Sequence, residues 1–418
     1  MRPFALFSLL VTVVATPLAA QSKYLFAWTG DSARQVSDFL AVIDADPASA
    51  TYGHVLTSVA VGATATLPHH TEYTFPADSM LLANGWAAGR TYLFDLRHPT
   101  APRVATSFTT VGGFSFPHSF ARLPNGHLIG TFQGTGGRYG APGGLVELDE
   151  RGHLLRSASA VAPGVADTLA WPYSLALDPA HDRAVVTVST MPIPSWLTPP
   201  AGSWTKARAD RVETAAVQVW RISDLHLLAT VPLPARSTAD TGDSAPQFYP
   251  AEPMPLPDGS FYVNTFNCGL FHVTGLDGPA PAVRLIHVFP TAPGTSCAVP
   301  AIVGHYWIQT VPSLPGLIAL DLSDPADPIE VSRLTFDLPG SQPHWMAADA
   351  AGSRVVVTFL NNSQVVVVNV DPKTGFLSVD RNFRDERTGR PGVDLGGRTW
   401  PQGAVARAYP HGTLFGPR

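Results

Sequence analysis

The feature that most constrains this chain is a repeated pattern of paired strands. Stretches with alternating apolar and polar side chains recur about every 45 residues, a period typical of repeat architectures. The second strand of many pairs ends in Asp, as in "YLFDL", "LVELD", "LIALDL" and "VVVNVD". After that Asp the chain turns into an outer strand such as "VATSFTT" or "IEVSRLTF". Each repeat is therefore predicted to hold an entry strand, a middle pair and an edge strand.

This period decides the fold class. The copies begin near Lys23, Leu67, Phe116, Trp171, Tyr249, Ser296 and Gln342. Four strands per copy and seven copies predict an all-β, seven-bladed β-propeller. A β-sandwich would not explain the regular period, and no segment shows helical periodicity. We assign residues 21–418 to one propeller domain, with a Pro-rich insertion at 190–204. The tail "GAVARAYPHGTLFGPR" (403–418) is expected to run back toward the first blade or over a face.

The first twenty residues differ from the rest. Arg2 is followed by an apolar stretch and by small residues that end in Ala19-Ala20, which predicts a secretory signal peptide over residues 1–20. The apolar run is shorter than the roughly 20 residues that a membrane span needs. No second segment could span a membrane, so we expect a periplasmic or secreted protein. In that oxidising environment Cys268 and Cys297 are expected to form a disulfide, with a thiol near a metal as the alternative.

The charge pattern argues against polyanionic partners. The formal net charge is −5, and Lys and Arg form no run. We therefore expect no binding to nucleic acid or to an anionic membrane.

Pro-His pairs recur at the starts of predicted strands, in "TLPHHTEYTF" (66–75), "SFPHSFARLPNG" (115–126) and "GSQPHWMAAD" (340–349). The innermost strands of a propeller all start on one face, so residues at one blade position converge on the axis. Aligning the repeats gives a column of His70, His118, Tyr173, Glu252 or Ala251, Cys297 and His344. Core positions usually hold aliphatic or Phe side chains, so this polar column indicates a role other than core packing.

Three imidazoles and a carboxylate on one axis favour a transition metal. We expect His70, His118 and His344 as ligands, with Glu252 as a further ligand or as the group that fixes a ring tautomer. The alternative is that these histidines only make buried hydrogen bonds. Strand alternation predicts that His69 points away from the axis. The remaining turn histidines are expected to be solvated: His127, His153, His181 and His305.

Several segments resemble one known family. "LPHHTEY", "FPHSFARLPNGHLIGTFQG", "WPYSLALDPAHDRAVVTVST" and "LIALDLSDPADPIEV" are similar to selenium-binding proteins and their bacterial relatives, the methanethiol oxidases. The resemblance implies a seven-bladed propeller and an exported, copper-dependent enzyme. Such enzymes convert methanethiol, oxygen and water into formaldehyde, hydrogen sulfide and hydrogen peroxide.

The match to the family's residues is uneven. His70, His118, Tyr173 and Glu252 fall where the family has matching residue types. The stretch "HHTEYTFPADS" lacks the family's cysteine, which puts selenium binding through that thiol in doubt. Leu314 stands where the family has a His, and His344 where some relatives have Gln.

The leading hypothesis is therefore an exported copper oxidase of a small thiol. Glu252 would accept a proton, and Tyr173 would hydrogen-bond oxygen species. The alternative is a non-catalytic periplasmic propeller that binds selenium, a metal or another ligand, or that serves as a scaffold. A lactonase is a third possibility, but Ca²⁺ sites favour oxygen ligands over imidazoles.

Overall fold

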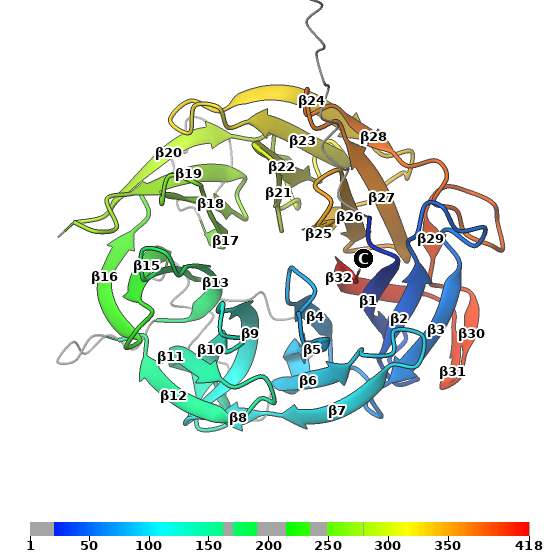
Figure 1. Cartoon of the computed structure of the whole chain (residues 1–418), viewed down its shortest axis with the longest axis horizontal. Coiled ribbons are helices and arrows are strands. Elements are labelled where there is room, and N and C mark those ends of the chain that lie inside the picture. Colours follow the sequence, from blue (N-terminus) through cyan, green and yellow to red (C-terminus); the bar gives the residue numbers. More distant parts are fainter. Residues whose placement is uncertain (1–20, 162–169, 190–214, 235–248, 279, 418) are drawn as a thin grey trace, which may run out of the picture.

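The strands form seven sheets around one axis, and the described parts of the chain show a seven-bladed β-propeller, as predicted (Figure 1). The computed structural model describes residues 21–161, 170–189, 215–234, 249–278 and 280–417. The predicted signal peptide and the 190–204 insertion lie outside the described residues.

Each blade is an antiparallel sheet, and consecutive strands run outward from the axis in most blades. Blade one contains β32 (Ala408–Phe415), β1 (Tyr24–Asp31), β2 (Phe39–Asp44) and β3 (Val55–Ala60). Blade two contains β4 (Pro68–Thr71), β5 (Met80–Gly85), β6 (Arg90–Asp95) and β7 (Arg103–Phe108). Blade three contains β8 (Thr110–Val111), β9 (Phe114–Arg122), β10 (Leu128–Thr135), β11 (Arg138–Leu148) and β12 (Leu154–Ser159). Blade four contains β13 (Pro172–Asp178), β14 (Arg183–Val188), β15 (Ala216–Arg221) and β16 (His226–Pro232).

The remaining blades follow the same order. Blade five contains β17 (Pro250–Pro255), β18 (Phe261–Thr265), β19 (Gly269–Thr274) and β20 (Ala282–Val288). Blade six contains β21 (Ala301–Val303), β22 (Tyr306–Val311), β23 (Gly316–Asp321) and β24 (Ile329–Thr335). Blade seven contains β25 (Pro343–Ala348), β26 (Arg354–Phe359), β27 (Gln364–Val370), β28 (Leu377–Val379) and β29 (Val393–Asp394). A separate ribbon pairs β30 (Arg398–Trp400) with β31 (Gly403–Val405), and η1 (Trp86–Ala88) is a short 3-10 helix. None of the described segments forms a helix long and apolar enough to cross a membrane.

Blade one is assembled from both ends of the chain. β32, from the C-terminal tail, pairs antiparallel with β1 and is the innermost strand of this blade (Figure 1). It also lies against β4 of blade two and β25 of blade seven. The tail therefore runs back to the first blade, one of the two courses that the sequence allowed.

The aspartates at the ends of the third strands stabilise the turns that follow. Asp95, Asp149 and Asp321 each accept a hydrogen bond from the backbone N–H two residues later. Such side-chain contacts favour a tight turn and explain why Asp recurs at this point of the repeat.

The apolar core is divided among the spaces between neighbouring blades. Ile129, Val186 and Trp220 pack together between blades three and four, for example, and all three are fully buried. Cys268 and Cys297 are joined by a disulfide with an S–S distance of 2.10 Å, the pairing expected from the sequence. This bond links blade five to the segment that enters blade six.

A buried arginine links the last blade to the first. The Arg354 side chain is 1 % exposed and donates hydrogen bonds to Asp349 and to the carbonyl oxygens of Ser22 (3.2 Å) and Ala45 (3.0 Å). Ser22 Oγ in turn donates to Asp349 Oδ1 at 2.9 Å. Since Ser22 and Ala45 flank β1 and β2, this cluster supports the closure of the ring.

Replacing Arg354 with Ala should therefore strongly destabilise the fold. The change leaves Asp349 as a buried charge without its cation, which typically costs about 3–5 kcal/mol in the free energy of unfolding. Denaturant unfolding of the purified variant measures this cost. The matched control is Arg333→Ala, which removes the exposed Arg333–Glu330 pair and should cost less than about 1 kcal/mol. Equal losses in the two variants would contradict the role of the Arg354 cluster.

Candidate metal centre

The candidate site is formed by residues at the start of the innermost strands, where the strand register shifts. In six blades the innermost strand shifts its pairing with the next strand just after a proline, as in a β-bulge. The prolines are Pro410, Pro68, Pro117, Pro172, Pro250 and Pro343, in blades one to five and seven. Because a bulge inserts an extra residue, simple alternation of side chains fails at this point.

The bulge corrects the prediction for His69. His69 does not point away from the axis: its Nε2 lies 2.9 Å from His118 Nε2, and its ring centroid is 4.5 Å from that of His70. Both histidines after Pro68 therefore enter the same cluster. The sequence alignment had matched His70 with His118, whereas His69 is the residue that follows its proline as His118 does.

The residues directly after the prolines form an arc of four histidines on adjacent blades. His344, His411, His69 and His118 come from blades seven, one, two and three in that order. We call these four residues the histidine arc. The ring centroids of His344 and His411 are 4.7 Å apart, and those of His411 and His69 are 4.2 Å apart. His411 was missed from the sequence because the position of its strand was unknown, although "YPHG" repeats the Pro-His signal.

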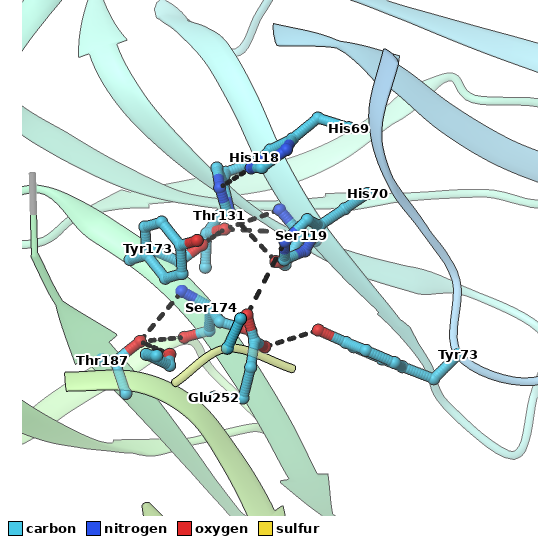
Figure 2. A network of polar contacts seen from close by, with 12 residues as sticks. His69, His70, Tyr73, His118, Ser119, Thr131, Tyr173, Ser174, Thr187 and Glu252 are labelled. Atoms are coloured by element: carbon cyan, nitrogen blue, oxygen red, sulfur yellow. Dashed lines mark hydrogen bonds and ion pairs between the residues drawn. The ribbon is translucent and has the colours of Figure 1, made fainter. Parts of the chain in front are cut away.

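The residues one position later form a second row beside the arc. This row contains His70, Ser119, Ser174, Glu252 and Trp345. Figure 2 shows how His70, Ser119 and Glu252 converge with Tyr73. Glu252 Oε2 accepts hydrogen bonds from Tyr73 Oη (2.5 Å) and from Ser174 Oγ, and its Oε1 lies 3.7 Å from His70 Nε2. Trp345 stacks on Tyr73 with ring centroids 5.0 Å apart.

Blade six contributes to neither row with a polar group. Ala298 N donates to Thr310 Oγ1 as Ser119 N donates to Thr131 Oγ1, so Ala298 stands at the second-row position and Cys297 at the arc position. Cys297 is in the disulfide and offers no free thiol. Tyr173 occupies the arc position of blade four, where its ring lies 3.9 Å from that of His118.

Burial keeps these histidines neutral. Desolvation lowers the pKa of His118 to about 3, and it lowers the pKa values of His69, His70 and His411 well below the usual range. A neutral imidazole has a lone pair for a metal, and a protonated one has none. Burial also raises the pKa of Glu252 to about 7, against the opposing effect of its hydrogen bonds from Ser174 and Tyr73.

Some buried polar atoms of the site have no partner among the described residues. These atoms are His70 Nε2, Glu252 Oε1 and both ring nitrogens of His411. His69, His70 and His118 also offer one ring nitrogen each within 4.8 Å of one another. Buried polar atoms normally have partners, so this donor set fits a transition metal with nitrogen ligands.

Ser119 limits which histidines can be ligands at the same time. Its Oγ contacts both His70 Nδ1 (2.7 Å) and His118 Nδ1 (3.1 Å). A hydroxyl has one proton, so Ser119 donates to one ring and accepts from the other. The two rings must then be opposite tautomers, and only one of them can present an unprotonated Nε2.

Apolar side chains pack against the arc on the side of Tyr173. Trp86 from η1 and Tyr139 from β11 are both buried in this apolar cluster. Their rings are 5.5 Å apart, and Phe116 lies 5.5 Å from Tyr139. This cluster keeps water from one side of the histidines.

The comparisons with known proteins agree with the family suggested by the sequence. No family model matches the chain. A methanethiol oxidase from a Hyphomicrobium species is 32% identical over 127 residues, which is 28% of this chain and 28% of that protein. A methanethiol oxidase from Ruegeria pomeroyi is 29% identical over 173 residues, or 36% of this chain and 38% of that protein. The matched segments thus span about a third of the curated relatives.

A solved structure extends the likeness in fold to nearly the whole chain. The hypothetical selenium-binding protein from Sulfolobus tokodaii has a TM-score of 0.72 and 15% identity, over 94% of both chains. At that identity the structural match shows the propeller fold alone. The sequence matches confirm a resemblance to methanethiol oxidases over about a third of the chain.

If Ser119 sets the tautomers, Ser119→Ala should weaken metal binding. Loss of such an orienting hydrogen bond typically lowers metal affinity by roughly 10–100-fold. Competition with a chromophoric chelator, using Cu²⁺ as the probe, measures the affinity, and Ser119→Thr should restore most of it. The matched control is Ser174→Ala. Ser174 stands at the same position of blade four, but its hydroxyl bonds Glu252 instead of a histidine. An unchanged affinity in Ser119→Ala would contradict the tautomer argument.

Proposed function

We propose that this protein is an exported, copper-dependent oxidase of a small thiol, similar in activity to methanethiol oxidase. The observation that carries the proposal is the histidine arc, in which His69, His118 and His411 are buried and neutral and both ring nitrogens of His411 lack a partner among the described residues. The chain also has sequence similarity to methanethiol oxidases. The disulfide supports export, since such bonds persist in oxidising compartments.

His69, His118 and His411 are the residues we propose as copper ligands, with the partly exposed His344 beside them. The tautomer constraint favours His118 over His70, because His118 Nε2 faces His69 Nε2 while His70 Nε2 faces a carboxylate. His118 then keeps its proton on Nδ1 and donates it to Ser119, and Ser119 donates to His70 Nδ1. His70 consequently carries a proton on Nε2, facing Glu252 Oε1. His70 and Glu252, which the sequence analysis proposed as ligands, become proton-handling groups in this account.

Copper would supply a one-electron couple and a Lewis acid that lowers the pKa of a bound thiol. In the proposed reaction methanethiol, oxygen and water become formaldehyde, hydrogen sulfide and hydrogen peroxide, one molecule of each. Methanethiol gives up two electrons and two protons, one proton from the methyl carbon and one from the thiol. Oxygen takes up both electrons and both protons as hydrogen peroxide. Water then replaces sulfur at the carbon, and the sulfur leaves as hydrogen sulfide.

The residues around the arc fit the proton transfers of this reaction. Glu252, with its pKa near 7, can accept a proton at neutral pH and pass it on. Tyr73 and Ser174 donate to its Oε2 and hold the carboxylate in place, which leaves Oε1 directed toward His70. The apolar side chains of Trp86, Tyr139 and Phe116 exclude water from the side of Tyr173.

Two variants separate metal binding from proton transfer. The copper-loaded protein should release hydrogen sulfide and hydrogen peroxide from methanethiol in equal amounts. His118→Ala should lose both the metal and the activity. Glu252→Gln should keep the metal while kcat falls about 100-fold or more, the usual contribution of a general base. Metal content is measured by elemental analysis and the products by coupled assays.

Two outcomes would contradict the proposal. A protein that binds copper tightly but oxidises no thiol would be a metal-binding propeller without this activity. Full activity in Glu252→Gln would exclude this carboxylate from the reaction.

A further inference from the structure

A pocket adjoins the starts of the strands that carry His69 and His411. It has a volume of about 300 Å³, the lower end of the range for small-molecule sites. Pro68, Tyr409 and Leu67 form apolar walls, and Asp31, Arg34 and Asp38 add charged groups. Pro68 directly precedes His69, and Tyr409 stands two residues before His411. We call this cavity the entrance pocket.

Asp38 is a buried carboxyl group without a cation. Its side chain is 1 % exposed, and its Oδ2 accepts hydrogen bonds from Thr66 N and Thr66 Oγ1, both at 2.7 Å. Among the residues that the structure describes, no ion pair includes Asp38. Burial raises the pKa of Asp38 to about 6, so the group is mostly ionised at neutral pH. A buried carboxylate of this kind is costly unless a cation reaches it.

The other oxygen of Asp38 lies at the pocket wall. A Cβ added to Gly30 would be 3.0 Å from both Asp38 Oδ1 and Pro68 Cδ, so this oxygen lies near the residue that precedes His69. Asp31 differs, because both of its oxygens accept backbone N–H groups of its own loop, from Ala33 and Gln35 among others. Asp38 is therefore the acidic group available to a ligand.

The walls indicate an organic cation in preference to a metal ion. Leu67, Pro68 and the Tyr409 ring leave most of the cavity without oxygen ligands, whereas Ca²⁺ requires six to eight. Apolar walls beside the Asp38 carboxylate suit an alkyl ammonium, and an aromatic ring also favours such a cation. Leu67 and Ala65 have positive φ angles of 58° and 56°, a strained conformation that is often retained at ligand sites.

From these observations we infer that the entrance pocket binds the primary ammonium group of a small ligand, with Asp38 as its counter-ion. The inference rests on the proposed function in one respect: the ligand is then an amino thiol, whose sulfur is oxidised at the histidine arc.

The direct test uses metal-free protein and a probe that cannot be oxidised. Calorimetric titration with propylammonium should show binding, and Asp38→Asn should weaken it at least tenfold. Asn keeps an oxygen for both Thr66 hydrogen bonds, so the fold should persist, as circular dichroism can verify. The control Asp327→Asn removes an exposed carboxylate of blade six and should leave binding unchanged. Equal binding of propanol, equal binding by Asp38→Asn, or preferential binding of propionate would each overturn the inference.

The copper-loaded protein then links the pocket to the substrate. Cysteamine should be preferred over ethanethiol in kcat/KM, and Asp38→Asn should lower that preference about tenfold. Propylammonium binding without oxidation of any thiol would refute the proposed function and leave the ammonium site standing. Oxidation of methanethiol by a protein that binds no ammonium would refute the ammonium site alone.

The pH dependence of stability provides a second readout of Asp38. Asp31 at the end of β1, Tyr92 on β6, and Arg34 and Tyr409 of the same pocket are the titratable or charged groups around it. The pKa of Asp38 is about 6 in the folded chain and 3.8 without the fold's influence. Between these values the unfolded chain has lost the proton that the folded chain retains. The contribution of this group to the free energy of unfolding therefore falls as pH rises from about 4 to 6 and then stays constant.

Asp38→Asn should abolish the decrease in the free energy of unfolding that Asp38 causes between about pH 4 and 6. Urea unfolding of the ligand-free protein at several pH values between 4 and 7 measures the free energy of unfolding. Relative to the parent, the variant should become more stable as the pH rises to 6. A constant difference across this range would contradict a buried, unpaired Asp38.

Discussion

The pairing of β32 with β1 is the interaction on which the rest of the structure depends. It closes the ring, and it also places His411 between His344 and His69, so that the arc spans four adjacent blades. The close approach of β32 to β4 requires a glycine, because a Cβ on Gly412 would lie 2.6 Å from both His69 O and Thr71 N. The buried Arg354 cluster supports the same closure through its contacts with Ser22 and Ala45, which flank β1 and β2. Fold closure and the candidate site are therefore built by the same strand.

The site is made by repeating one local device around the axis. A proline fixes the start of an innermost strand, and the bulge after it turns two consecutive side chains toward the neighbouring blades. The first position supplies the histidine arc, and the second supplies the groups that we propose to orient it or to handle protons. Since Ser119 contacts both His70 and His118, the two rows act as one hydrogen-bonded unit. This arrangement explains why two of the proposed ligands, His69 and His118, stand directly before His70 and Ser119 of the second row.

Much of the fold could be predicted from the sequence, because the repeat is regular and its turn chemistry is local. The predicted starts of the repeats near Leu67, Trp171 and Gln342 agree with the starts of β4, β13 and β25. The candidate site was predicted less completely. Strand alternation gave the wrong direction for His69, since period-two reasoning fails at a bulge. His411 was not recognised because the sequence did not place the tail inside blade one, and the entrance pocket depends on side chains from three separate segments.

Electron paramagnetic resonance of the protein reconstituted with Cu²⁺, together with elemental analysis, tests the central claim most directly. The account predicts one copper per chain with three nitrogen ligands, and loss of one of these nitrogens in His411→Ala while the fold is retained. A parent protein without stoichiometric copper would contradict the account, and so would a His411→Ala spectrum identical to that of the parent.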